Sequence, residues 1–97
     1  MSYSFLPPAR AELEEAVDYH ESCRAELGDE FAAEVRRAID TIVHRPRIWA
    51  KISKNTHRYR LPKFKYALLY QIRGDEVLIV AVAHLRRPTY WHDRIDP

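Results

Sequence analysis

The feature that most constrains the fold of this chain is an almost unbroken apolar run near its end. Residues Glu76–His84 read Glu-Val-Leu-Ile-Val-Ala-Val-Ala-His, which is the length of a strand and favours a buried central strand. The preceding segment, Lys65–Arg73, is rich in aromatic and aliphatic residues, and Gly74-Asp75 lies between the two runs as a turn. The two runs are therefore predicted to pair as an antiparallel β-hairpin.

Two helices are predicted in the first half, because apolar residues recur there at steps of three and four. Pro8 suits the first turn of the first helix, and Gly28 is expected to end that helix in the left-handed conformation. Asp29 is expected to cap the second helix, and Pro46 is expected to stop it. So short a turn predicts an antiparallel helical hairpin. The two apolar stripes are Leu13, Ala16, Val17, His20, Cys23 and Leu27, and then Phe31, Val35, Ala38, Ile39, Ile42 and Val43.

The remaining segments complete a small sheet. Tyr3–Leu6 reads as a short strand ended by a proline pair, and Thr56–Leu61 has the alternating character of a strand. Residues 47–55 read as a loop with Trp49 as its one large anchor. The expected fold is α+β: a short N-terminal strand, an antiparallel helical hairpin and a three-stranded antiparallel meander, with the helices packed on one face of the sheet.

Charge is distributed unevenly along the chain. Residues 1–44 carry four Arg against ten acids, a balance of −6, whereas residues 45–97 carry twelve Lys and Arg against four acids, a balance of +8. Such asymmetry suggests an anionic partner for the second half. The alternative is that each half simply solvates its own surface.

Composition argues against several classes of protein. Cys23 is the only cysteine, so no internal disulfide forms, and no cluster of soft ligands suggests zinc or another cofactor. The first residues lack the basic segment and apolar run of a signal peptide, and no stretch of about 18 apolar residues exists to span a membrane. The 97 residues are expected to form a single domain, 1–97, in a reducing cytoplasm.

The order of these elements, together with four local motifs, resembles the RelE/ParE toxin superfamily over nearly the whole chain. The motifs are Phe5-Leu-Pro-Pro-Ala-Arg-Ala-Glu-Leu-Glu-Glu-Ala, Gly28-Asp-Glu-Phe-Ala-Ala-Glu-Val, Lys63-Phe-Lys-Tyr-Ala-Leu-Leu-Tyr and Val80-Ala-Val-Ala-His-Leu-Arg-Arg-Pro-Thr-Tyr-Trp. The resemblance implies the growth-inhibiting toxin of a type II toxin–antitoxin system, of the kind also called plasmid stabilisation proteins. A cognate antitoxin would silence it in a hetero-oligomer.

The resemblance leaves two targets open. Ribonuclease members of the superfamily act on messenger RNA in the ribosome without a metal, using a basic set with a tail Tyr or a Glu–His–Tyr set. His84 and Tyr90 match the second pattern, but the loop from Arg47 to Asn55 supplies Lys51 and Lys54 in place of its glutamate. ParE-type members inhibit DNA gyrase instead, and the long helical hairpin favours this interpretation. A non-toxic binding module with the same fold is the third reading.

Several residues of the second half are candidates for chemistry. Period two puts Arg58 and Arg60 on one face of their strand, at a spacing that lets two guanidinium groups share one anion such as a phosphate. His84 could transfer protons near neutral pH, with Tyr90 and Arg58 beside it, if the chain is a ribonuclease. The alternatives are solvated arginines and a histidine that packs against the helices and bonds a backbone carbonyl.

Further residues are candidates for binding a target or the antitoxin. Lys65, Arg86 and Arg87 are expected to contact an anion or a target together with Arg60, whereas Trp91 either holds the tail on the sheet or joins them. Antitoxin segments in the superfamily place apolar side chains in grooves beside the helices. Four residues of the helical stripes could border such a groove, although a helical stripe is more often core: Leu13, Val17, Phe31 and Val35.

Overall fold

A computed structural model describes residues 1–87 and 91–95 of the chain. Its sheet has four strands in the order β1-β4-β3-β2, with β1 at Ser2–Phe5, β2 at Thr56–Arg60, β3 at Tyr66–Arg73 and β4 at Glu76–His84. The predicted hairpin of β3 and β4 is confirmed, and Gly74 in its turn takes a positive φ of 60°. The short first strand joins this sheet as well, because β1 lies parallel to β4 along its outer edge.

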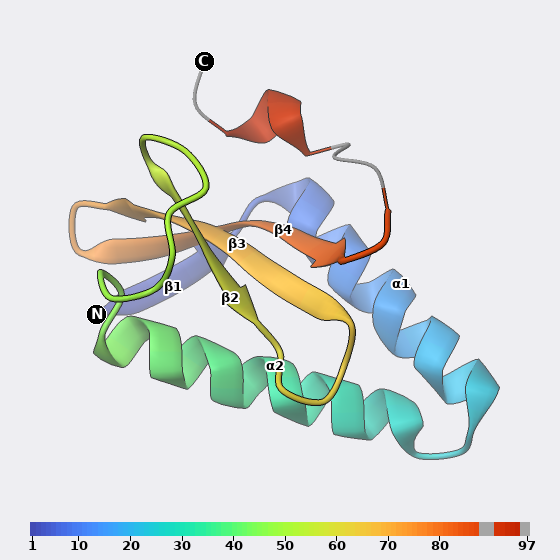
Figure 1. Ribbon diagram of the computed structural model, residues 1–97. Coiled ribbons are helices and arrows are strands. Elements are labelled where there is room, and N and C mark those ends of the chain that lie inside the picture. Colours follow the sequence, from blue (N-terminus) through green and yellow to red (C-terminus); the bar gives the residue numbers. More distant parts are fainter. Residues whose placement is uncertain (88–90, 96–97) are drawn as a thin grey trace.

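The two predicted helices are confirmed as α1, Pro7–Cys23, and α2, Leu27–His44. They fold back on one another as a hairpin and cover one face of the sheet (Figure 1). The side chains that fill the space between the layers come from α2, β3 and β4 and are almost fully buried: Phe31, Val35, Ile42, Leu68, Tyr70, Val77 and Ile79. The predicted α+β fold is therefore the fold of this chain. Among the described residues, no helix is both long enough and apolar enough to cross a bilayer.

The β3–β4 hairpin contains one irregularity that repositions the end of β4. The register shifts between Leu69 and Tyr70, so that Leu69 pairs with Ala81 and Tyr70 pairs with Ile79. Val80 is the extra residue, and a bulge of this kind exchanges the faces of all residues beyond it. Ile79 faces the helices before the bulge, and Val82 faces them after it.

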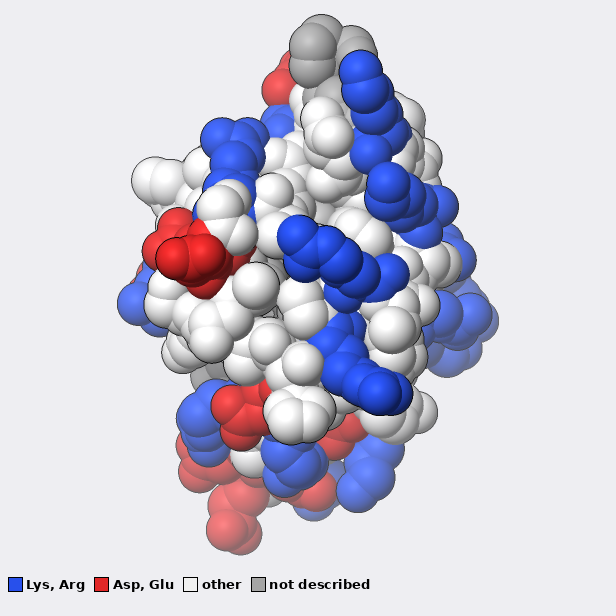
Figure 2. Space-filling model, turned by 90° about the vertical axis from the view of Figure 1, so that its left-hand side faces the viewer, with Lys and Arg blue, Asp and Glu red and all other residues white. Residues whose placement is uncertain are grey.

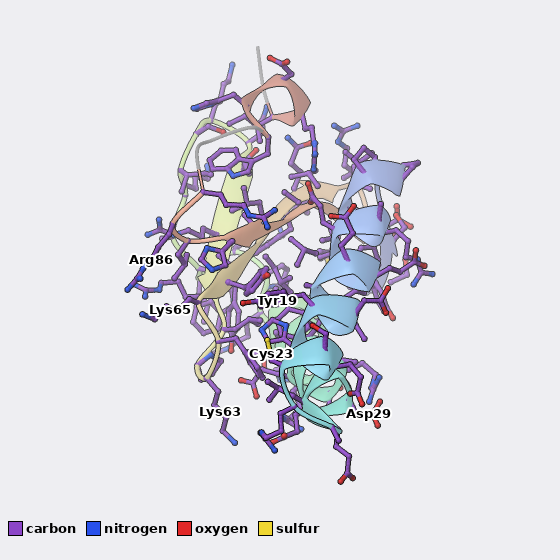
Figure 3. The ribbon with its side chains drawn as sticks, turned by 90° about the vertical axis from the view of Figure 1, so that its right-hand side faces the viewer. Tyr19, Cys23, Asp29, Lys63, Lys65 and Arg86 are labelled. Atoms are coloured by element: carbon purple, nitrogen blue, oxygen red, sulfur yellow. The ribbon has the colours of Figure 1, made fainter. Side chains whose placement is uncertain are left out.

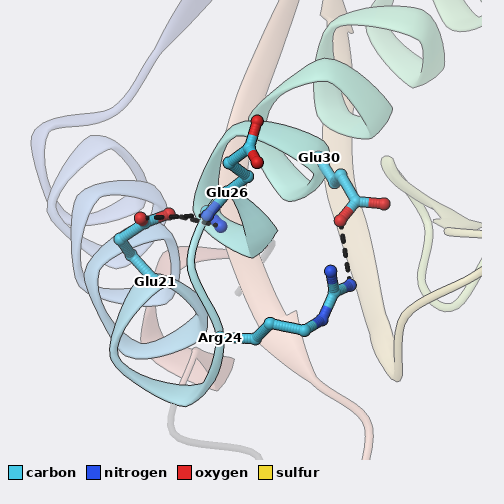
Figure 4. Close-up of polar contacts among 5 residues, drawn as sticks. Glu21, Arg24, Glu26 and Glu30 are labelled. Atoms are coloured by element: carbon cyan, nitrogen blue, oxygen red, sulfur yellow. Dashed lines mark hydrogen bonds and ion pairs between the residues drawn. The ribbon is translucent and has the colours of Figure 1, made fainter.

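The connection between the helices differs from the prediction. Gly28 does not end the first helix, and Asp29 does not cap the second, because α2 already begins at Leu27. The left-handed residue is Glu26, with a φ of 71°. The carboxylate of Glu21 accepts hydrogen bonds from the amides of Glu26 and Gly28, at 3.1 Å each, which provides the missing cap (Figure 4).

The second face of the sheet is covered by the end of the chain. Trp91 and Ile95 pack against a small cluster formed by Leu69, Val80 and Ala81, and a 3₁₀ turn, His92–Arg94, lies between them. Arg94 is held by an ion pair of 2.7 Å to Glu12 of α1. The tail is thus fixed to the sheet and to the first helix at once.

Gly28 allows α1 and α2 to approach closely. Helix propensity alone would predict that replacing it with Ala stabilises the protein, whereas the close approach predicts the opposite. A Cβ at this position would lie 2.7 Å from the carbonyl oxygen of Val17. Gly28→Ala is therefore expected to lower the free energy of unfolding by about 1–3 kcal/mol, although Ala is favoured over Gly inside helices. Urea denaturation followed by circular dichroism measures this change. An unfolding midpoint equal to that of the unsubstituted protein would show that the crossing is looser than described.

Candidate functional site

A cleft of about 390 Å³ opens between α1 and the C-terminal end of β4. Its floor is formed by Tyr66 of β3 and by Val82 and His84 of β4, and its mouth carries Arg86 and Arg87. Figure 3 looks onto this side, with Tyr19 and Cys23 on α1 and with Lys65 and Arg86 at the end of the sheet. The helix wall consists of Glu12, Glu15, Ala16 and Tyr19.

His84 is the titratable group at the centre of this cleft. Its Nδ1 accepts a hydrogen bond of 3.1 Å from the backbone amide of Arg86, so the ring is assigned with its proton on Nε2. The edge of the ring meets the ring of Tyr66, at 5.0 Å between centroids. Partial burial lowers the pKa of His84, and the nearby charges of Arg87, Arg86, Lys65 and His20 lower it further. His84 is therefore a neutral acceptor at pH 7, enclosed by cations.

The two tyrosines of the cleft hold their protons firmly. Burial raises the pKa of Tyr66, while the charge of Arg87 lowers it and Tyr19 raises it. A hydrogen bond with the Cys23 thiol is the main reason that the pKa of Tyr19 is raised. Both hydroxyl groups are thus neutral donors or acceptors near pH 7. Among residues 1–87 and 91–95, no group of three His, Cys, Asp or Glu side chains is arranged to hold a metal ion.

Only some of the predicted anion-binding residues meet in this cleft. Arg86 and Arg87 line it, and Lys65 is close enough to lower the pKa of His84. Arg58 and Arg60 are exposed on β2, whereas the alternate residues His57, Tyr59 and Leu61 turn toward the helices. The two arginines therefore lie on the opposite face of the sheet from His84. The bulge at Val80 is the physical reason, because it turns His84 to the helix side.

The tail residues are placed differently from one another. Tyr90 lies outside the residues that the structure describes. Trp91 is partly buried against Leu69, Val80 and Ala81, on the face of the sheet that the helices leave open, and does not line the cleft. It acts as a packing anchor, which is one of the two roles considered for it.

A second hollow, of about 350 Å³, lies beside the helical hairpin and β1. Leu13, Val17 and Val35, three of the four residues proposed to border an antitoxin groove, line it. Phe31, the fourth, is fully buried in the core, where it stacks on His20 at 4.6 Å between ring centroids. The groove also has residues that were not proposed to border it. Its apolar lining adds Tyr3, Phe5, Ala32 and Ile39, and its rim carries Arg10, Glu14, Asp18 and Arg36.

The comparisons with known proteins agree with this architecture. A family model described as the ParE toxin of the type II toxin–antitoxin system parDE matches residues 3–88. The chain belongs to the ParE toxin family. No curated protein matches the chain significantly.

Two solved structures share the fold of this ParE-family chain. One is described as the chromosomal ParDE toxin–antitoxin system from P. aeruginosa; its TM-score is 0.66 at 12% identity, over 89% of this chain and 97% of that one. The other is the isolated E. coli RelE toxin, with a TM-score of 0.66 at 16% identity, over 96% of this chain and 93% of that one. Since both identities are low, these likenesses show the fold alone.

Sequence reasoning missed the tyrosines of the cleft in this ParE-family chain. Tyr66 lies opposite His84 in the β3–β4 register, so the hairpin prediction contained part of the signal. An unbroken register from Gly74-Asp75 would instead pair His84 with Lys65, because the bulge moves the pairing by one residue. Tyr19 is on α1 but outside the apolar stripe, and its spacing in the sequence does not indicate that it lines a cleft.

The charges around His84 give a prediction for its titration. Arg87 lowers the pKa of both His84 and Tyr66, so Arg87→Gln is expected to raise the pKa of each. The shift of His84 should exceed that caused by Arg86→Gln, and Arg36→Gln on the exposed surface of α2 should cause none. NMR titration of the histidine Cε1–H resonance measures this. An unchanged His84 pKa in Arg87→Gln would place the guanidinium away from the ring.

The same lowered pKa sets a pH dependence of stability. The pKa of His84 in the folded chain is below its ordinary value of about 6.5, so the unfolded chain binds more protons as the pH falls through that value. The stability contributed by neutral His84 is therefore present above about pH 6.5 and is lost as the pH falls toward the folded pKa. His84→Gln is expected to flatten this part of the profile of unfolding midpoint against pH. A profile with the same slope in the variant would assign the dependence to other groups.

Proposed function

We propose that this ParE-family chain, acting as a single domain in the cytoplasm, inhibits DNA gyrase and is neutralised by a cognate antitoxin. The match of the ParE toxin family model to residues 3–88 carries this proposal. ParE-type members of the superfamily inhibit gyrase by binding, and a binding inhibitor needs no set of catalytic groups around one phosphorus atom.

The separation of the basic residues supports inhibition by binding. Metal-free cleavage of RNA needs a base, an acid and cations around one phosphate. His84 and Arg58, proposed as parts of such a set, lie on opposite faces of the sheet. Loop 47–55 has no glutamate that could complete a Glu–His–Tyr set.

One observation favours the competing function, a ribosome-dependent ribonuclease. The cleft brings together a neutral histidine, two arginines and two tyrosines, which are groups of the right kinds for phosphate chemistry. A ribonuclease built here would use His84, Arg86 and Arg87 in place of Arg58. The two proposals therefore differ in what they require of His84.

The groove beside the helical hairpin is the proposed antitoxin site. Its lining is apolar, and both signs of charge occur on its rim, which suits one face of an amphipathic segment. Leu13 and Val17 remain partly exposed there, as an unoccupied docking surface requires. Phe31 is buried in the core and is not proposed to contact the antitoxin itself.

Replacing His84 distinguishes gyrase inhibition from cleavage of messenger RNA. If the toxin inhibits gyrase by binding, His84→Ala should arrest growth as strongly as the unsubstituted chain, because no proton transfer is involved. Both proteins should inhibit supercoiling by purified gyrase to within about twofold, and messenger RNA should remain intact. Rapid cleavage of translated messages that disappears in His84→Ala would establish the ribonuclease instead. Normal growth on induction of either protein would favour a non-toxic binding module.

The antitoxin groove is tested by placing a charge on its lining. Val17→Glu should weaken binding of the antitoxin encoded by the neighbouring reading frame by at least about tenfold, which corresponds to ~1.4 kcal/mol. Ser22→Glu adds the same charge to an exposed position of α1 outside the groove and should leave the affinity unchanged. Isothermal calorimetry measures both, and retained toxicity shows that Val17→Glu still folds. Equal affinities for the two variants would place the antitoxin elsewhere.

A further inference from the structure

The chain contains a long segment that is entirely free of acidic residues. No Asp or Glu occurs between Asp40 and Asp75, although this segment carries nine Lys and Arg residues. All nine are exposed in the structure. The positive balance of the second half is therefore concentrated on particular elements: the loop after α2, strand β2 and the β2–β3 turn.

The fold brings the cations of these elements together at one edge of the sheet. The loop after α2 runs along β2, because the amide of Ile52 donates to Thr56 and the amide of Arg58 donates to Ala50, at 2.9 and 2.8 Å. The β2–β3 turn is closed by the amide of Leu61 donating to Tyr66. Six cations on this loop, strand and turn form what we call the basic band: Lys51, Lys54, Arg58, Arg60, Lys63 and Lys65.

Two views show this concentration of charge. Figure 2 shows Lys and Arg side chains gathered along one side of the molecule, with most of the acidic groups below them. Figure 3, from the opposite direction, shows Lys63 and Lys65 projecting away from α1 into solvent. Both place the cations on the side of the molecule where β2 and its loop lie in Figure 1.

In the described part of the chain, no acidic side chain forms an ion pair with the basic band. Within residues 1–87 and 91–95, the ion pairs are Arg24–Glu30, Arg37–Glu34 and Arg94–Glu12, and none of them involves the band. Two of these pairs belong to the helical hairpin, so arginines elsewhere in this chain do find acidic partners. Exposed cations that are brought together without counter-charges repel one another, and a polyanion relieves that repulsion.

The aromatic residues near the band decide which polyanion it fits. Proteins that hold single strands stack the bases on exposed aromatic rings. The rings next to the band are partly buried: Trp49, Tyr59 and Phe64 pack against the core, and Trp91 packs against Leu69, the residue of β3 that pairs with Arg58. The exposed tyrosines of the described parts, Tyr3 and Tyr19, lie on β1 and α1. A surface with cations and without a stacking platform can contact phosphates but cannot read bases.

We propose that the basic band binds the phosphodiester backbone of duplex DNA, without preference for its sequence. Guanidinium groups two residues apart on β2 and lysines on both sides of them supply contacts to successive phosphates. This inference goes beyond the proposed function, because it assigns a DNA contact to a surface of the toxin itself. Binding is measured with the purified chain and DNA alone, so the result does not depend on whether gyrase is the target.

Fluorescence anisotropy with a labelled 20-base-pair duplex of arbitrary sequence tests the proposal. The full chain should bind with a Kd of roughly 1–100 μM near physiological salt, and the affinity should fall steeply as salt is added. Each phosphate contact contributes about −0.9 to the slope of log K against log salt, so Arg58→Gln/Arg60→Gln should reduce the steepness by about 2. Arg24→Gln/Arg37→Gln removes the same charge from the helices and should leave the slope unchanged.

Further variants and competitors make the outcome decisive. Thermal melting checks that the variants fold, and Lys63→Gln/Lys65→Gln provides a second pair from the band with the same expected loss of slope. The proposal is overturned if the helix pair reduces binding as much as the band pairs, since net charge alone would then account for it. It is also overturned if the duplex does not bind at 50 mM salt, or if single-stranded RNA or DNA of the same length binds more tightly than the duplex.

Discussion

The carboxylate of Glu12 joins three parts of the structure: helix α1, which carries it, strand β4, and the C-terminal segment that carries Arg94. The cleft depends on this connection. Strand β1 ends at Phe5, and the last backbone bond on this edge of β4 runs from the amide of Leu6 to Ile79. Among the residues that the structure describes, no strand lies beside β4 on this edge beyond that point. Glu12 takes the place of one, because one of its oxygens accepts from the amide of Val82 at 2.9 Å and the other pairs with Arg94. Arg94 in turn donates to the carbonyl of Val80.

This small network has consequences for both faces of the sheet. It positions α1 against β4, and so it sets the width of the cleft in front of His84. It also holds the segment that carries Trp91 and Ile95 over the opposite face. The pair is largely shielded from solvent, with 19% and 15% of the two side chains exposed, so that loss of either partner would leave buried polar groups unsatisfied.

The sequence predicted most of the fold, since the fold depends on periodicity and turn residues that short segments reveal. The apolar stripes located both helices, and Gly74-Asp75 fixed the hairpin of β3 and β4. The helix turn was predicted wrongly, because Gly28 serves the close crossing of two helices, a contact between residues of different helices that no local signal encodes. The candidate site was harder to predict for a similar reason. Alternation along β4 holds only up to Val80, and the bulge then moves His84 to the face opposite Arg58.

The order of the strands separates the two proposed interaction surfaces. The groove proposed for the antitoxin lies against β1, and the basic band lies on β2, so the two occupy opposite edges of one sheet. A partner seated in the groove therefore does not cover the band by its position alone. Silencing by such a partner would have to act through its size, its charge or the segment that follows the docked portion.

The bulge at Val80 has a consequence for how such a domain diversifies. Deleting this one residue would restore strict alternation and leave every side chain from Ala81 onward on the face that it already occupies, because Val80 and Ala81 both face away from the helices. A lineage could thus gain or lose one codon in the middle of this strand without turning His84 out of the cleft. Relatives that share this architecture at low identity can then differ in the length of one strand while the same side chains face the helices.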